Sequence, residues 1–121
     1  MPIRRILVVD DSPTERFALT ELLTREGYQV LTAENGEQAL ALARAELPDL
    51  VLMDVVMPGM NGYQATRQLH RDAATRHIPV IICTTKGQEA DRAWGLRQGA
   101  VAYLVKPIDE TALLAAIRSM E

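Results

Sequence analysis

The sequence has almost no cysteine and no long apolar run. Its one cysteine, Cys83, rules out an intramolecular disulfide, which suits a reducing compartment without proving one. The longest apolar runs are only a few residues long, too short to cross a membrane. The apolar run near the amino terminus stops at Asp10 and Asp11, so it predicts a strand and not a signal peptide. We therefore expect a cytoplasmic protein with no membrane insertion.

The sequence also lacks an excess of positive charge and the length needed for a second domain. The net charge of −3 argues against a nucleic-acid partner, since phosphate binding favours basic surfaces. A chain of 121 residues can bury its own core without disulfides but leaves no room for a second domain of ordinary size. We therefore expect one domain over residues 1–121, with no output domain attached.

Short β-branched runs alternate with longer amphipathic stretches along the whole chain. The predicted strands are Ile6–Val9, Val30–Ala33, Leu50–Met53, Val80–Cys83 and Ala102–Val105. Several are apolar at nearly every position, as expected for a parallel sheet that is covered on both faces. Because crossovers are right-handed and helices must cover the strands, the pattern predicts an α/β fold. Five units are too few for an eight-stranded barrel, so we expect a (βα)5 doubly wound open parallel sheet.

The predicted helices between these strands have readable ends. The first opens at Ser12, with Pro13 suited to the first helical position and Glu15 placed to complete a capping box. It should end before Gly27. The others are predicted to open at Asn35, near Asn61, near Gln88 and at Asp109.

Polar residues follow four of the five predicted strands. They are Asp10-Asp11 after the first, Asp54 after the third, Thr84-Thr85 after the fourth and Lys106-Pro107 after the fifth. Ligands of open α/β sheets bind at these carboxyl ends. Three carboxylates placed together repel one another unless a cation intervenes, and an all-oxygen set suits Mg²⁺. Because a carboxylate can also accept a phosphoryl group, and Lys106 and Thr84 can stabilise its charge, the sequence predicts Mg²⁺-dependent phosphoryl transfer.

Four segments together resemble the response-regulator receiver domain, which has the CheY-like fold. They are ILVVDDS, LVLMDVVMPGMNGYQ, PVIICTTK and AYLVKPID. The resemblance covers essentially the whole chain and implies a flavodoxin-like sheet with strand order 2-1-3-4-5. The segment TTKGQEADRAWGLRQGA, with VVMPGMNGYQATRQL, is also similar to the PilH-type regulators of twitching-motility chemosensory systems.

This resemblance implies a role for each acid of the site. Asp54 corresponds to the phosphoacceptor. Asp11 and Asp10 correspond to the acid pair that holds Mg²⁺, Asp10 through water, and the backbone carbonyl of Val56 to the third protein ligand. The implied phosphodonor is a histidine kinase or a small phosphodonor. The domain would then catalyse only its own phosphorylation and dephosphorylation, and it would not otherwise be an enzyme.

The resemblance also implies how the signal leaves the site. Thr84 corresponds to a hydroxyl that moves toward the phosphoryl group, and Lys106 to the cation that pairs with it, with a cis bond to Pro107. Tyr103 corresponds to an aromatic switch that packs into the space that Thr84 vacates. A downstream protein target would bind the face made by the fourth helix, the fifth strand and the fifth helix. The chain would be a monomer or a phosphorylation-dependent dimer, in chemotaxis or twitching motility.

Two positions depart from chemotaxis CheY itself. Val56, two residues after Asp54, is apolar, and Lys86, two residues after Thr84, is basic. In receivers both positions flank the path of the hydrolytic water. The two residues therefore bear on the lifetime of the phosphorylated state and not on the chemistry of acceptance.

Other interpretations remain open at this point. A small Mg²⁺-dependent phosphatase, a flavin- or nucleotide-binding module and a pseudo-receiver scaffold would all fit a similar sheet. Thr84 could simply bond backbone groups at a strand end, and Tyr103 could be an ordinary half-buried aromatic. Trp94 could pack against the sheet or contact a partner, and His70 and His77 are expected to be solvated.

Overall fold

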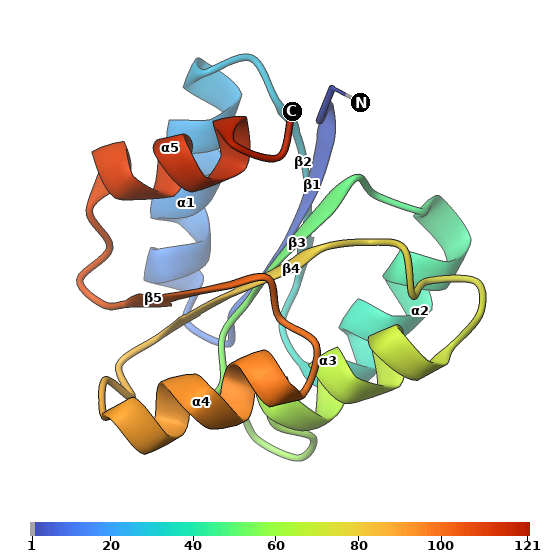
Figure 1. Ribbon diagram of the computed structural model, residues 1–121. Helices are drawn as coiled ribbons and strands as arrows, with labels where there is room; N and C mark the ends of the chain where they lie inside the picture. Colours follow the sequence, from blue (N-terminus) through green and yellow to red (C-terminus); the bar gives the residue numbers. More distant parts are fainter. Residues whose placement is uncertain (1) are drawn as a thin grey trace.

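A computed structural model describes residues 2–121, in which strands and helices alternate from end to end (Figure 1). The elements are β1 (Arg5–Val9), α1 (Pro13–Arg25), β2 (Gln29–Ala33), α2 (Gly36–Glu46), β3 (Leu50–Met53), α3 (Gly62–Arg71), β4 (Val80–Thr84), α4 (Glu89–Arg97), β5 (Ala102–Val105) and α5 (Glu110–Arg118). Every predicted strand and helix is present, and the strand bounds differ from the prediction by at most one residue. No helix within residues 2–121 has both the length and the apolar character needed to span a bilayer.

The strands form one parallel sheet in the order β2-β1-β3-β4-β5. This confirms the predicted doubly wound α/β fold. The strand order reverses between β1 and β3, because the chain first runs outward to β2 and then returns across the sheet. In such sheets the crevice outside the carboxyl ends of the strands at this reversal is where ligands bind. The predicted acids follow these two strands.

Helices cover both faces of the sheet, and the alternation of side chains along each strand divides the core in two. Ile6 and Val8 of β1 pack in the cluster that includes residues of α1 and α5. Leu7 and Val9 pack in the cluster that includes residues of α2 and α3. Figure 1 shows α1 and α5 together on one side of the sheet and α2, α3 and α4 on the other. Burial of each such aliphatic side chain contributes about 1.5–3 kcal/mol, so the core holds the strand ends, and the site residues on them, in fixed positions.

The start of α1 differs from the prediction. The Ser12 hydroxyl accepts a hydrogen bond from the Glu15 N–H at 3.3 Å and Pro13 is the first helical residue, as expected. The capping box, however, is wrong: the Ser12 N–H donates to the Asp10 carboxylate at 2.9 Å. The Glu15 carboxylate bonds the ammonium of Lys106 instead, because a cation is a stronger partner for a carboxylate than a neutral N–H. A capping box is present at α3, between Asn61 and Gln64.

Four side chains outside the site differ in their exposure to solvent. Cys83 is buried, and burial raises the pKa of its thiol to about 12, so it packs as a small apolar group. His70 and His77 are both exposed. Trp94 on α4 is 48% exposed, so a large part of its ring is available to a partner.

Candidate functional site

Three carboxylates converge at the carboxyl ends of β1 and β3. Asp10, Asp11 and Asp54 each offer an oxygen atom, and these oxygens lie within 4.8 Å of one another. Asp10 and Asp54 are buried, while Asp11 is exposed. All donors in this group are carboxylate oxygens, the ligand type that hard cations such as Mg²⁺ prefer. The donor set therefore fits a magnesium ion, and the convergence predicted from the strand ends is confirmed.

Asp54 lies at the end of β3 and has an electrostatic environment that is unfavourable for its charge. Its N–H donates to the Val9 carbonyl at 2.9 Å, which pairs the ends of β3 and β1. Burial and the nearby charge of Asp10 raise the pKa of Asp54 to about 6, although Lys106 and a 2.8 Å hydrogen bond from the Val55 N–H act in the opposite direction. A cation bound among these acids would relieve the repulsion, a second indication that the site suits a metal ion.

The backbone of Asp54 lies against the first residue of α3. A Cβ atom added to Gly62 would lie 2.0 Å from the Asp54 carbonyl oxygen, so no other residue fits there without a shift of the backbone. The Gly62 N–H donates to the Val55 carbonyl at 3.0 Å. Gly62 thus allows α3 to approach the phosphoacceptor candidate closely. We did not predict this role; the only signal in the sequence is a glycine directly after the capping residue Asn61.

Lys106 lies among the acids and is largely buried. Its Nζ atom is 2.8 Å from Oδ2 of Asp10, 2.8 Å from Oε2 of Glu15 and 3.6 Å from Oδ1 of Asp54. Burial alone would lower the pKa of Lys106, but the hydrogen bonds to Asp10 and Glu15 and the charge of Asp54 raise it above its usual range. Lys106 is therefore a permanent cation at neutral pH. The contribution of Glu15 was missed because the sequence motif around it favoured a helix cap.

Thr84 connects this cation to the loop that follows β4. It is fully buried, its carbonyl accepts the Lys106 N–H at 2.8 Å, and its hydroxyl accepts the Lys86 N–H at 3.3 Å. The Lys106–Pro107 peptide bond is cis, as the resemblance implied. Thr85 is exposed. The Thr84 hydroxyl is thus bonded to the β4–α4 loop.

Tyr103 on β5 points inward. It is 2% exposed, so the residue is buried and not half-buried. Its hydroxyl donates to the Lys86 carbonyl at 2.7 Å and lies 3.0 Å from the Tyr63 hydroxyl. A Cβ atom on Gly95 of α4 would lie 2.8 Å from Cδ2 of the ring. Tyr63 lies within hydrogen-bond distance of the Tyr103 hydroxyl, and the absence of a side chain at Gly95 leaves room for the ring. Neither role was predicted, because both depend on contacts between distant segments.

The two positions that depart from CheY lie at the surface. The Val56 side chain is 55% exposed, and Lys86 is exposed in the loop after β4. Each follows a site residue by two positions. Both side chains are therefore accessible to solvent.

Comparison with known proteins gives a consistent result. Residues 6–118 match the response regulator receiver domain family. The chain is 63% identical over 116 residues to protein PilH of Pseudomonas aeruginosa, covering 96% of each protein. This confirms the resemblance to PilH-type regulators. In a longer relative, the response regulator PleD of Caulobacter vibrioides, the chain is 48% identical and spans 26% of the protein's length.

Solved structures agree with the fold and with the chemistry of the cluster. The receiver domain of the sensor histidine kinase PA1611 from Pseudomonas aeruginosa, which has a magnesium ion coordinated in its active-site cleft, superposes with a TM-score of 0.88 at 31% identity, covering 96% of this chain and 95% of that one. A chain of the CheX–CheY–BeF3–Mg complex of Borrelia burgdorferi superposes with a TM-score of 0.91 at 29% identity, covering 97% and 88%. Receiver domains are phosphorylation-based regulators and not a classical enzyme family. The chain belongs to the response regulator receiver domain family.

Proposed function

We propose that Asp54 accepts a phosphoryl group from a histidine kinase and that the domain signals by phosphorylation-dependent protein binding. One observation carries this proposal: three carboxylates and the ammonium of Lys106 converge at one edge of the sheet. Structural needs do not explain three acids at this edge, two of them buried, and burial together with the nearby charge of Asp10 raises the pKa of Asp54. Such unbalanced charge in a crevice is typical of a functional site.

The same residues account for the proposed dependence on Mg²⁺. Asp10, Asp11 and Asp54, with the backbone carbonyl of Val56, would hold the ion, and Asp10 would do so through water. The bound ion would neutralise the acids and withdraw negative charge from the phosphoryl oxygens. Asp11, which is exposed, keeps this edge of the cluster accessible to solvent and to a donor.

The transfer itself needs a nucleophile and a cation from the protein. One carboxylate oxygen of Asp54 forms a new bond to phosphorus while the bond between phosphorus and the donor's histidine nitrogen breaks. The electron pair of that bond stays on the imidazole, which takes a proton from solvent. Lys106, 3.6 Å from Asp54, pairs with the added negative charge, about −1.5 to −2 if it titrates like other phosphorylated side chains. The Thr84 hydroxyl donates to a phosphoryl oxygen once it turns away from the Lys86 N–H.

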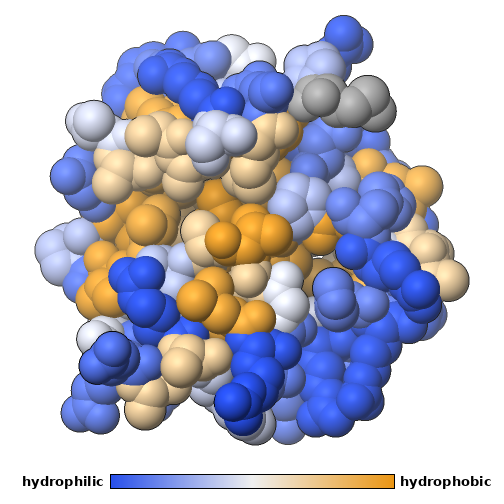
Figure 2. Space-filling view, viewed as in Figure 1, coloured by the Kyte–Doolittle hydropathy of each residue, from blue (hydrophilic) through white to orange (hydrophobic). Residues whose placement is uncertain are grey.

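That turn would carry the signal to a binding surface. The β4–α4 loop is bonded to Thr84 through the Lys86 N–H and to Tyr103 through the Lys86 carbonyl, so movement of Thr84 alters the anchor of Tyr103. Leu96 on α4 and Val105 on β5 are exposed, and apolar side chains gather across the middle of the face shown in Figure 2. A downstream protein would bind the α4–β5–α5 face, to a monomer or a phosphorylation-dependent dimer.

The relatives and the composition support a proposal for the cellular setting. The identity with PilH supports a stand-alone regulator in a chemotaxis or twitching-motility system. A single buried free thiol, Cys83, suits the cytoplasm. Size-exclusion chromatography with and without beryllofluoride and Mg²⁺ would show whether phosphorylation drives dimerisation.

The decisive test is labelling by acetyl phosphate in the presence of Mg²⁺. We expect stoichiometric, acid-stable but base-labile labelling of the wild-type protein and none of the Asp54→Ala variant, because the nucleophile is gone. Asp49→Ala is the matched control, since Asp49 precedes β3 as Asp54 follows it, and it should label like the wild type. Undiminished labelling of Asp54→Ala would disprove the assignment.

A further inference from the structure

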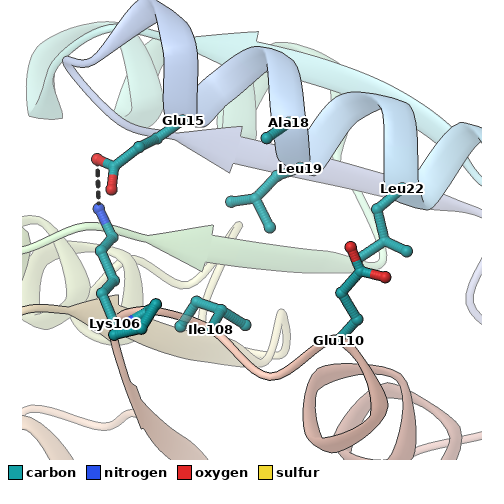
Figure 3. Close-up of a pocket in the computed structure, with 8 residues that line it drawn as sticks. Glu15, Ala18, Leu19, Leu22, Lys106, Ile108 and Glu110 are labelled. Carbon is teal, nitrogen blue, oxygen red and sulfur yellow. Dashed lines mark hydrogen bonds and ion pairs between the residues drawn. The ribbon is translucent and has the colours of Figure 1, made fainter.

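Glu15 lies in the first turn of α1, yet its side chain takes no part in the helix cap. Its carboxylate extends across a groove of about 210 Å³ between α1 and the start of α5. There it accepts a hydrogen bond from the ammonium of Lys106 at 2.8 Å, which Figure 3 shows as a dashed line. The rest of this groove is lined mainly by apolar side chains such as Leu19 and Ile108. Within it, the contact between Glu15 and Lys106 is a polar link between the first helix and the end of β5.

The hydrogen bonds of Lys106 hold its ammonium on the side of the site formed by β1 and α1. An ammonium has three N–H donors. Lys106 donates to Oδ2 of Asp10 and to Oε2 of Glu15, both at 2.8 Å, whereas Oδ1 of Asp54 is 3.6 Å away. That last distance is too long for a hydrogen bond. The cation is therefore hydrogen-bonded toward β1 and α1, and it makes only a longer ion pair with Asp54.

We propose that Glu15 is a positioning residue that holds the Lys106 ammonium back from Asp54 in the unphosphorylated protein. This inference rests on the proposed function of Asp54 as phosphoacceptor. Asp10 and Glu15 differ in burial: the Asp10 side chain is 2% exposed and the Glu15 side chain 45% exposed. The Glu15 carboxylate can be rehydrated at little cost, whereas a buried carboxylate that loses its cation is strongly destabilised. Glu15 is thus the partner that Lys106 can leave when a phosphoryl group arrives.

The charge of Glu15 acts in the same direction as its hydrogen bond. A phosphoryl group on Asp54 adds negative charge to an edge that already carries Asp10, Asp11 and Glu15. Lys106 must turn from Glu15 to pair with the new anion. Glu15 therefore opposes the phosphorylated state twice, by competing for the cation and by repelling the anion. Its presence keeps the resting and phosphorylated arrangements of Lys106 distinct.

The test compares two isosteric substitutions that remove the same charge. Glu15→Gln keeps the shape of the side chain but removes the ionic partner of Lys106. Glu110→Gln is the matched control: Glu110 lines the same groove, is 65% exposed and pairs with Arg25 at 3.7 Å rather than with Lys106. Two quantities are measured in each protein. They are the ¹⁵N chemical shift of Lys106 Nζ without ligand, and the affinity for beryllofluoride at saturating Mg²⁺ by calorimetry.

We expect Glu15→Gln to shift the Lys106 Nζ resonance and to bind beryllofluoride about threefold more tightly, the size of effect typical of one partly exposed charge. Glu110→Gln should change neither. A purely structural ion pair would move the resonance and leave the affinity unchanged, and that result would overturn the proposal, as would weaker binding by Glu15→Gln. If the wild-type protein bound no beryllofluoride, the proposed function of Asp54 would fail first. The Lys106 resonance would still show whether the pair with Glu15 forms.

Discussion

Two aspartates flank β3, and the protein treats their charges in opposite ways. Asp49, just before the strand, is exposed and accepts the backbone N–H groups of Arg4 at 2.9 Å and Arg5 at 3.0 Å. These hydrogen bonds hold its pKa below the usual range. Asp54, just after the strand, is buried beside Asp10, and its pKa is raised to about 6. The same residue type is thus stabilised as an anion at one end of a four-residue strand and destabilised at the other.

The opposite pKa shifts of Asp49 and Asp54 distinguish a carboxylate that stabilises the fold from one that we assign to function. At the amino end of β3, the Asp49 carboxylate accepts hydrogen bonds from two backbone N–H groups at the start of β1. At the carboxyl end, the residues of the chain leave repulsion that a cation would remove. Protein sites that depart from local rules in this way are expected to be functional. The contrast can be tested by changing each end of the strand and measuring the free energy of unfolding.

The largest expected effect comes from the close packing beside Asp54. Gly62→Ala would place a Cβ atom 2.0 Å from the Asp54 carbonyl oxygen, and backbone cannot rotate away as a side chain can. We expect a loss of about 3 kcal/mol in unfolding free energy, at the upper end of overpacking effects, measured by urea denaturation.

Gly36→Ala is the matched control for that substitution. Gly36 also begins a helix after an asparagine cap, but the atoms nearest to its added Cβ would be Cβ, Cγ and Sδ of Met60, each at 3.0 Å. It should cost about 1 kcal/mol, the lower end of overpacking effects, since contacts of 3.0 Å need a much smaller shift than a contact of 2.0 Å. Equal losses of unfolding free energy in the two variants would show that the packing at the carboxyl end of β3 is no tighter than the packing at the start of α2.

The fold could be predicted from the sequence almost completely, because its signals are local. Apolar runs mark the strands, and capping residues such as Asn35 and Asn61 mark the helix starts. The convergence of Asp10, Asp11 and Asp54 could also be predicted, because parallel strands present their carboxyl ends at one edge.

What could not be predicted depends on pairs of distant residues. The sequence around Glu15 predicted a capping box, whereas the Glu15 carboxylate bonds Lys106, which is 91 positions away. The hydroxyls of Tyr63 and Tyr103 meet across 40 positions. No periodicity or spacing along the chain encodes which of two possible partners lies closer in space.

The second effect should be a gain in stability. Asp54→Asn removes a buried charge that Asp10 repels, so in metal-free buffer with chelator we expect the unfolding free energy to rise by about 2 kcal/mol. Asp11→Asn is the control within the cluster. Because Asp11 is exposed, solvent screens its charge, and the gain should be smaller. A loss of stability in Asp54→Asn would mean that Lys106 already balances the acids.

The smallest effect should come from the same substitution at the other end of the strand, with the opposite sign. Asp49→Asn replaces a charged acceptor of the Arg4 and Arg5 N–H groups with a neutral one, which weakens both hydrogen bonds. We expect a loss of about 1 kcal/mol at pH 7, because hydrogen bonds to charged groups exceed neutral ones by about that amount. Urea denaturation at several pH values measures the difference from the wild type.

The pH dependence of the stability difference between the wild type and Asp49→Asn shows whether the charge of Asp49 causes that difference. The pKa of Asp49 is lowered in the folded protein, so its ionised form stabilises the fold at any pH above the unfolded value of about 3.9. As the pH falls through the lower folded-state pKa, Asp49 takes up a proton and the stabilisation is lost. The two proteins should therefore converge in stability as the pH falls below the folded-state pKa of Asp49. Glu21→Gln, at an exposed glutamate of α1, is the control for the loss of one carboxylate. A gap between wild type and Asp49→Asn that persists unchanged into acid would show that Asp49 acts by shape and not by charge, and the contrast between the two ends of β3 would then no longer be electrostatic.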